Sequence, residues 1–154
     1  MKGLGCRAFS LVEVVLALGI CAFVLVAMLG LFTTGLRASR ESEEQVQAAN
    51  LASQILARRL ASPTNASSAL TIPASALTNS YADVFGSSGA FVGLDGRTNG
   101  SAENASYRII CRAGTNALTG PRLAQVYLLL TWPPQAALSN AAGRYETLTY
   151  IPLY

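Results

Sequence analysis

The residue types that usually perform catalysis or hold metal ions are scarce in this sequence. It contains no histidine, so histidine-based catalytic triads and the commonest metal ligand are both missing. The three cysteines lie before, inside and far beyond a long apolar run, at Cys6, Cys21 and Cys111. Because no two of them are expected to meet, we expect no disulfide within the chain and treat each as a small apolar side chain. The sequence therefore predicts no catalytic residue, no metal site and no cofactor.

Three oxygen-bearing side chains, Asp95, Asn99 and Glu103, lie close together in a polar stretch, and such side chains are the ligands that calcium prefers. Their spacing matches no established calcium loop, and acidic residues are few in this stretch. We therefore interpret it as a solvated turn rather than as a calcium site.

Glu13 is a carboxylate in an unusual setting. It is the only charged residue in the 24 residues from Phe9 to Phe32. A carboxylate inside a membrane helix is costly, so such a residue generally has a function. The plainer interpretation is that Glu13, about one turn after Phe9, simply extends its side chain to the membrane surface.

The run that contains Glu13 is long enough to cross a membrane. As a helix it would measure about 36 Å, against a hydrocarbon layer of about 30 Å. The whole chain is 51% hydrophobic and only 12% charged, and the apolar excess is concentrated in this run. We therefore predict one membrane-spanning segment, followed by a chain long enough for a single small domain.

The positive charges give no sign of nucleic-acid binding. Eleven Lys and Arg stand against eight Asp and Glu, and the positive residues are scattered apart from the pair Arg58 and Arg59. No basic stripe interleaved with aromatic residues is present, so we predict no nucleic-acid partner.

Several kinds of membrane signal compete for the N-terminus. A cleaved secretory signal has a shorter apolar core followed by a site of small residues, and residues 33–37 do not provide one. A lipoprotein signal is excluded because Cys6 precedes the apolar run. An uncleaved signal anchor stays open, and Lys2 and Arg7 would place its N-terminus in the cytoplasm.

Residues 7–15 read Arg-Ala-Phe-Ser-Leu-Val-Glu-Val-Val. This junction resembles the type IV pilin signature, in which a small residue precedes a cut and Phe-Ser/Thr-Leu-Ile/Val-Glu opens a long apolar helix. The resemblance implies that residues 1–8 form a prepilin leader, cut between Ala8 and Phe9, and that Phe9 is then N-methylated. It also implies that Glu13 acts in assembly. The family usually has Gly where this chain has Ala8.

The resemblance further implies the partners and the location. These are a prepilin peptidase, other pilin or pseudopilin subunits, a membrane assembly platform and the lipid bilayer. The chain would cross the bacterial inner membrane once, with its N-terminus cytoplasmic and its head periplasmic. Within the family it is most similar to the minor pseudopilin I and PilV class, or to the prepilin-like "cassette protein B" family.

The helix that carries this signature is predicted to continue beyond the membrane. Residues 9–34 form its apolar half and residues 35–61 an amphipathic half, which ends near Leu60 because Ser62-Pro63 follows. Gly30 marks a point where local unwinding during assembly is plausible for such a helix, although a small residue also permits close helix packing. One face of the amphipathic half is predicted to pack on the head, through Val46, Ala49, Ser53, Leu56 and Leu60.

The remaining residues, 62–154, are predicted to form the head. The segment 61–105 is rich in Ser, Ala, Asn and Gly, and we expect irregular structure with one short strand or helical turn. Three strands are predicted at 107–111, 123–132 and 144–151, the middle one apolar on both faces. Short connections favour an antiparallel meander on the helix, so the fold class is α+β.

The sequence thus favours a minor pilin or pseudopilin subunit of a type II secretion or type IV pilus-like filament. The rival is a single-pass anchored periplasmic binding domain that never polymerises. An anchored enzyme is disfavoured because the head has no clustered titratable groups, no Cys/His pair and no phosphate-binding loop.

Overall fold

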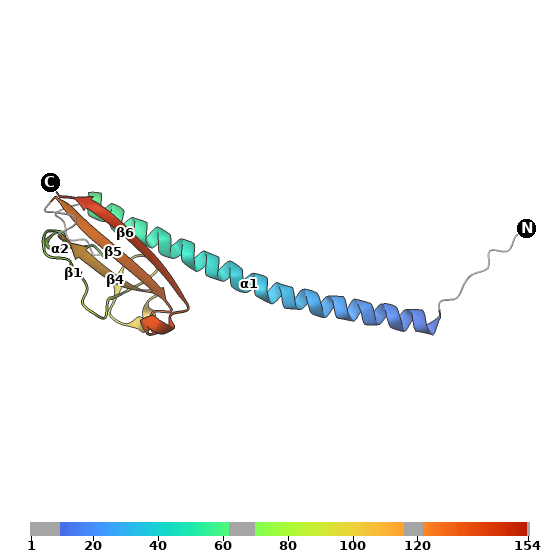
Figure 1. Ribbon diagram of the computed structural model, residues 1–154. Helices are drawn as coiled ribbons and strands as arrows, with labels where there is room; N and C mark the ends of the chain where they lie inside the picture. Colours follow the sequence, from blue (N-terminus) through green and yellow to red (C-terminus); the bar gives the residue numbers. More distant parts are fainter. Residues whose placement is uncertain (1–9, 62–69, 116–121, 154) are drawn as a thin grey trace, which may run out of the picture. The chain divides into compact units, whose positions relative to one another are not determined.

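The computed structural model describes residues 10–61, 70–115 and 122–153 (Figure 1). The first element is helix α1, Leu11–Ala61. The described chain divides into two compact units, one ending at Glu41 and the other running from Ser42 to Tyr154. The boundary falls within α1, so the last part of this helix belongs to the second unit, which we call the head.

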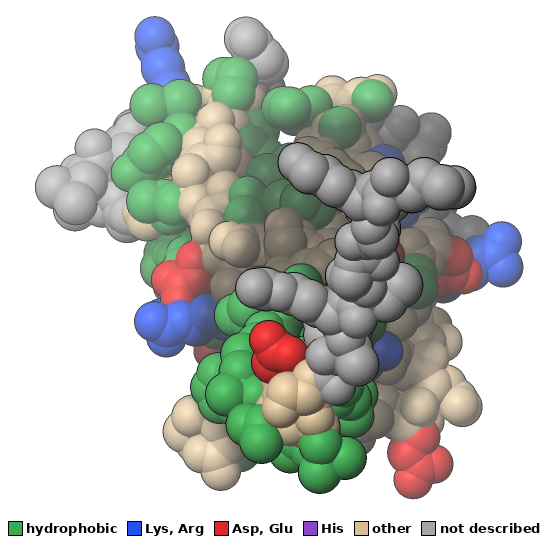
Figure 2. Space-filling view, turned by 90° about the vertical axis from the view of Figure 1, so that its right-hand side faces the viewer, with side chains coloured by type: hydrophobic (Ala, Val, Ile, Leu, Met, Phe, Trp, Pro, Cys, Tyr) green, Lys and Arg blue, Asp and Glu red, His purple; other side chains and the backbone are tan. Residues whose placement is uncertain are grey.

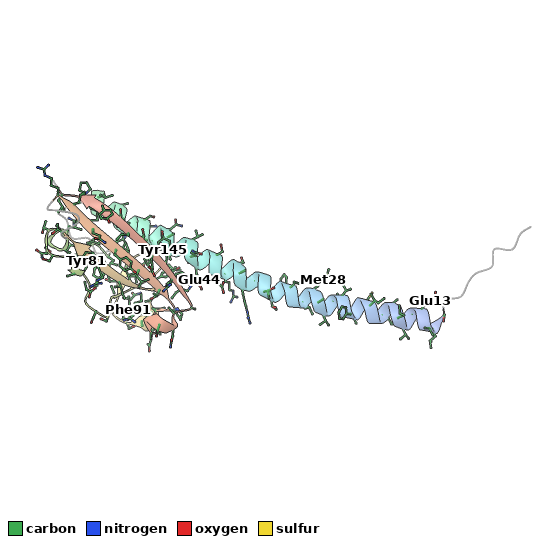
Figure 3. All side chains as sticks on the ribbon, viewed as in Figure 1. Glu13, Met28, Glu44, Tyr81, Phe91 and Tyr145 are labelled. Atoms are coloured by element: carbon green, nitrogen blue, oxygen red, sulfur yellow. The ribbon has the colours of Figure 1, made fainter. Side chains whose placement is uncertain are left out.

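Helix α1 follows the predicted course. It ends at Ala61, one residue after the predicted end. Every residue from Ser10 to Val46 is exposed, whereas burial begins at Gln47 and Ala48. The apolar half is therefore helical without support from the rest of the described chain, and its side chains, such as Met28, project outward (Figure 3).

The face of α1 that packs on the head differs from the predicted one. Val46 and Leu60 are 57% and 60% exposed, and Ser53 is exposed as well. The residues that are buried on this helix are Ala48, Leu51, Ala52, Ile55 and Arg59. Of the predicted face, Ala49 and Leu56 are half-buried, and Leu56 packs against the core. The prediction was therefore only partly right, because apolar residues occur on more than one side of this segment. Small alanines, which the pattern underweights, allow the helix to lie close to the sheet.

The head contains an antiparallel sheet whose main part is the predicted meander. Strands β4 (Tyr107–Gly114), β5 (Leu123–Trp132) and β6 (Gly143–Pro152) pair in that order. The bounds of β5 are those predicted, and β4 and β6 are slightly longer than predicted. With α1 packed on this sheet, the α+β class is confirmed.

The sheet has six strands rather than the three that were predicted. The additional strands are only two or three residues long: β1 (Ala82–Asp83), β2 (Ala90–Val92) and β3 (Thr98–Asn99). They lie in the segment where only irregular structure with one short element was expected, together with helix α2 (Ala74–Thr78) and the 3₁₀ turn η1 (Ala102–Asn104). These short strands depend on their backbone hydrogen bonds to β4 and to each other, because segments of two or three residues have little preference of their own for a strand.

The head's core lies between α1 and one face of the sheet. Strand β5 is central, as predicted, but only its alternate residues from Ala124 to Leu130 are fully buried. On the opposite face of β5, residues 125, 127 and 129 are half-exposed and Thr131 is buried, so this apolar face is only partly covered. The largest fully buried side chains of the core are Ile55, Ile72, Ile109, Leu128 and Leu130.

Aromatic side chains fix the end of the head where α1 enters it. The rings of Tyr107 and Trp132 meet edge to face, with centroids 5.9 Å apart. The hydroxyl group of Tyr107 is 3.3 Å from the backbone oxygen of Glu44 and 3.3 Å from Oε1 of Gln47. Opposite Trp132 on the next strand is Gly143, where a β-carbon would overlap the indole ring. The ring therefore lies directly over the glycine.

Candidate functional site

The candidate site at the start of α1 is built from a reciprocal pair of side chains. The backbone N–H of Ser10 donates a hydrogen bond to Oε2 of Glu13, at 3.1 Å. The hydroxyl oxygen of Ser10 accepts one from the N–H of Val12, at 3.3 Å, and the N–H of Glu13 donates to the Ser10 carbonyl at 3.0 Å. This arrangement is a capping box, in which a Ser before the helix and a Glu three residues later satisfy N–H groups that the helix leaves without partners.

Sequence reasoning missed this capping role, although the signal was present. Ser-x-x-Glu before an apolar run is itself a helix-start pattern. The carboxylate also lies at the positive end of the helix dipole, which favours a negative charge there. The two residues that flank the proposed cut, Ala8 and Phe9, lie outside the described residues, as does Cys6.

An exposed apolar surface follows Glu13 (Figures 2 and 3). In Figure 2, hydrophobic side chains surround much of the helix end. Large apolar residues such as Phe23, Leu31 and Phe32 are at least 65% exposed, and Cys21 is also exposed. The helix is long and apolar enough to span a membrane, and none of its most apolar window is buried. A surface of this kind in water would be an association site or a membrane segment.

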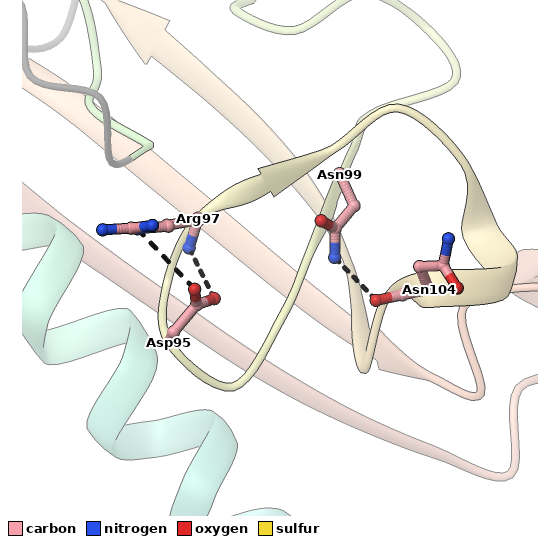
Figure 4. A network of polar contacts seen from close by, with 4 residues as sticks. All are labelled: Asp95, Arg97, Asn99 and Asn104. Atoms are coloured by element: carbon pink, nitrogen blue, oxygen red, sulfur yellow. Dashed lines mark hydrogen bonds and ion pairs between the residues drawn. The ribbon is translucent and has the colours of Figure 1, made fainter.

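Two of the three candidate calcium ligands, Asp95 and Asn99, make contacts within their own loops (Figure 4). Oδ1 of Asp95 accepts the backbone N–H of Arg97 at 3.1 Å, and the two side chains form an ion pair of 3.7 Å. Nδ2 of Asn99 donates to the carbonyl oxygen of Asn104 at 2.6 Å. Among the described residues, no group of three or more His, Cys, Asp or Glu could hold a metal ion.

Two further titratable groups of the head, the thiol of Cys111 and the guanidinium of Arg112, are also engaged in the fold. Cys111 is buried on the inner face of β4, and this burial raises the pKa of its thiol to about 12. On the opposite face, Nε of Arg112 lies 3.0 Å from Oδ1 of Asp83, and its guanidinium lies over the ring of Tyr81.

A groove of about 360 Å³ opens in the head where α1 ends. Its walls come from the last turn of α1, from α2 and from the end of β6, and they include Leu77 and Ile151. Arg59 is the charged residue among them, and it is only 8% exposed and already engaged in an interaction. The groove therefore offers a mainly apolar wall without a set of polar groups that would orient a substrate.

Comparisons with protein-family models, with curated proteins and with solved structures found no match to this chain.

Proposed function

We propose that this chain is a minor pilin or pseudopilin subunit of a bacterial type II secretion or type IV pilus-like filament. Prepilin peptidase would cut it between Ala8 and Phe9 and methylate Phe9. Residues 9–34 would anchor it in the inner membrane, with the N-terminus cytoplasmic and the head periplasmic. The observation that carries the proposal is a single carboxylate, Glu13, in the first turn of a helix whose apolar surface is exposed on every side.

The chemistry of the cut gives that carboxylate a second partner. Cleavage before Phe9 creates an ammonium group about one turn from Glu13. When the helix enters a filament, each of these charges would be costly to bury alone, while a hydrogen-bonded pair recovers much of that cost. Pairing with a neighbour's amine would also favour one axial offset between subunits. In this role the Glu13 carboxylate would give up its hydrogen bond from the Ser10 N–H and pair with the ammonium group instead.

Such assembly uses the exposed apolar surface rather than the head. The platform in the membrane and the other subunits would contact α1, where small residues such as Ala17, Cys21 and Gly30 permit close approach between helices. A β-carbon at Gly30 would meet no other described atom within 4 Å, which leaves this surface open to a neighbour.

The second candidate is a single-pass anchor that never polymerises, and the capping box favours it. A helix start explains Ser10 and Glu13 without any partner. The two functions differ in what they require of residue 13. A capping box accepts Glu or Gln, whereas pairing with an ammonium group requires the charge.

The variant Glu13→Gln separates these functions. It keeps the size and the capping oxygen but removes the charge, so we expect normal insertion and normal cleavage together with poor incorporation into a filament. Glu43→Gln, an exposed substitution in the head, serves as the matched control and should incorporate normally. The measurement is co-purification with partner subunits at equal membrane levels. Full incorporation of Glu13→Gln would contradict the assembly role.

Processing is tested in the same cells by intact mass. Co-expression with a prepilin peptidase should remove residues 1–8 and add one methyl group. Ala8→Gly should be cut at least as fast, and Ala8→Leu hardly at all, because a bulky side chain does not fit a site for a small one. Equal processing of all three chains, or a mature protein that keeps Met1, would refute the cut.

A further inference from the structure

The two edges of the head's sheet differ in how they are closed. Strand β4 is covered on its outer side by two short strands, β2 near its start and β1 near its end. On the other side, β6 is the outermost strand. It pairs with β5 over ten residues in a constant register, from Leu123 opposite Pro152 to Trp132 opposite Gly143, so it contains no bulge.

The register shows which backbone groups of β6 point away from β5. Leu153 N–H donates to the oxygen of Arg122 at 2.8 Å, and these two residues are opposite each other in the β5–β6 register. Hydrogen-bonded and non-hydrogen-bonded pairs alternate along an antiparallel ladder. The N–H and C=O groups that face the free edge are therefore those of Arg144, Glu146, Leu148 and Tyr150. Pro152, which has no N–H, occupies the next position in this series, as the pattern requires.

These groups have no partner in the described part of the chain. No backbone hydrogen bond involves any of the four residues beyond the strand ladder. Four N–H and four C=O groups at alternate residues thus form an open row.

Strand β6 also lacks the features that usually prevent pairing at an edge. Between Arg144 and Ile151 it contains no proline, no glycine and no lysine, and it is rich in Tyr and Thr, which favour strands. Its two charges offset each other, because Nε of Arg144 lies 3.6 Å from Oε1 of Glu146. On the same face, Leu148 and Tyr150 are 51% and 53% exposed.

We propose that the free edge of β6 binds an extended segment of another polypeptide, which adds a further strand to the sheet. Only an extended backbone presents N–H and C=O groups at the two-residue spacing of this row. The row itself identifies the class of ligand, and the side chains beside it restrict the ligand's sequence.

A second copy of this chain does not fit the edge. Strand β6 and the part of α1 in the head run in the same direction (Figure 1). Antiparallel pairing of two copies would therefore send these helical segments in opposite directions, whereas the proposed function has both copies enter one membrane through α1 in the same direction. Parallel pairing in register would place like groups opposite each other. This exclusion rests on the proposed membrane anchor, whereas the open row does not.

The side chains of β6 define what an antiparallel ligand would carry. A cation belongs opposite Glu146 and a carboxylate opposite Arg144, while an apolar residue belongs opposite Leu148. On the inner face, Tyr145 and Thr147 are only half-buried, so β-branched residues opposite them would extend the covered surface of the sheet.

A capped heptapeptide with the sequence Thr-Thr-Val-Val-Lys-Val-Glu is the probe that meets these conditions. Paired antiparallel from position 150 to position 144, it places Lys opposite Glu146 and Glu opposite Arg144. The control peptide exchanges Lys and Glu and leaves the composition unchanged. Binding to the full chain in detergent micelles is measured by fluorescence anisotropy, and its location by amide hydrogen exchange.

We expect the probe to bind about fivefold more tightly than the control peptide, because two cross-strand charge pairs change sign. It should slow exchange at the amides of residues 144, 146, 148 and 150, which are fast in the free chain. Glu146→Lys combined with Arg144→Glu should reverse the preference. Because both peptides are compared on the same double variant, a loss of its stability would weaken both equally and would not produce this reversal.

A backbone variant tests the row directly. Leu148→Pro removes an N–H that points to the free edge and leaves the bonds to β5 in place, so binding should weaken at least tenfold. Leu148→Thr is the matched control and should retain binding. Equal binding to both variants, no binding to the wild-type chain, or four amides that are already protected in the free chain would each overturn the proposal. None of these measurements depends on cleavage or assembly. The edge can therefore bind the peptide even if the chain is not a pilin subunit, and the chain can be a pilin subunit even if the edge binds no peptide.

Discussion

Helix α1 contains two halves that form the same secondary structure for different reasons. From Leu11 to Glu41 the residues are exposed and mostly apolar, and no described part of the chain packs against them. From Ser42 to Ala61 the helix exposes mostly polar side chains, together with Val46 and Leu60, and buries Leu51 and Ile55 against the sheet. The first half is suited to an environment that the chain does not itself supply. The second half is held by contacts within the head.

The difference shows that helicity by itself says little about what a segment does. Apolar side chains in the second half contribute to folding because water is removed from them within the chain. In the first half the same kinds of side chain contribute nothing to the stability of the head. Any burial of these side chains would have to come from outside the described part of the chain, so substitutions there should leave the head's stability unchanged.

The largest expected effect is the loss of folding stability when a charge is placed in the core of the head. Ile55→Asp places a charge in the core, where Ile55 is fully buried, and should destabilise the head by more than about 4 kcal/mol. Val46→Asp, on the exposed side of the same helix, should change stability by less than about 0.5 kcal/mol. Denaturant unfolding of both full-length variants in micelles, followed by the fluorescence of Trp132, measures the two effects. Similar losses would mean that the helix packs through the face predicted from sequence.

The face of α1 that packs on the sheet could not be predicted reliably from the sequence. The strong features were predictable: the apolar run, the helix end before Ser62-Pro63, and the three long strands with their order. The choice between faces was not, because Leu51, Ile55, Leu56 and Leu60 surround much of the helix. Only the shape of the sheet selects the side that carries Ala48 and Ala52. Strands β1 to β3 were missed for a related reason, since their bonds to neighbouring strands define them.

The candidate site shows the same limit at close range. The motif around Glu13 predicted a function from charge and position, and a capping pattern in the same residues passed unnoticed. The exact partner of the carboxylate depends on rotamer and backbone geometry, which spacing alone does not specify. The predicted meander already placed residues 144–151 at one edge of the sheet. That this is the edge left open was beyond prediction, because it depends on the short strands β1 and β2 that cover β4.

A smaller effect compares two glycines, one in each half of the molecule. Gly143 lies against the indole of Trp132, so Gly143→Ala forces the ring or the strand to move and should cost about 1–3 kcal/mol. A β-carbon at Gly35 would meet no described atom within 4 Å, so Gly35→Ala should leave the head's stability unchanged while favouring the helix. The same unfolding assay checks both. A head that tolerates Gly143→Ala would show that Trp132 does not pack on this strand.

The smallest effect compares two cysteines through the pH dependence of stability. Burial raises the pKa of Cys111 from 9.0 to about 12, so the folded head keeps a proton that the unfolded chain releases above pH 9. The unfolded state then binds fewer protons than the folded state, and stability must fall as pH rises. The loss should be about 1.4 kcal/mol between pH 8 and pH 10 and should continue toward pH 12.

The variant Cys111→Ala removes this contribution and leaves that of the buried tyrosines, whose raised pKa values act in the same direction at higher pH. The informative quantity is therefore the difference in slope between Cys111→Ala and the wild-type head, not the stability of either at one pH. Cys21→Ala, in the exposed half, is the matched control and should keep the wild-type slope because Cys21 has no part in the head's core. Unfolding at pH 8, 9 and 10 measures all three chains. If Cys111→Ala and the wild-type chain lose stability equally, the thiol ionises as readily in the head as in water, and β4 does not bury it.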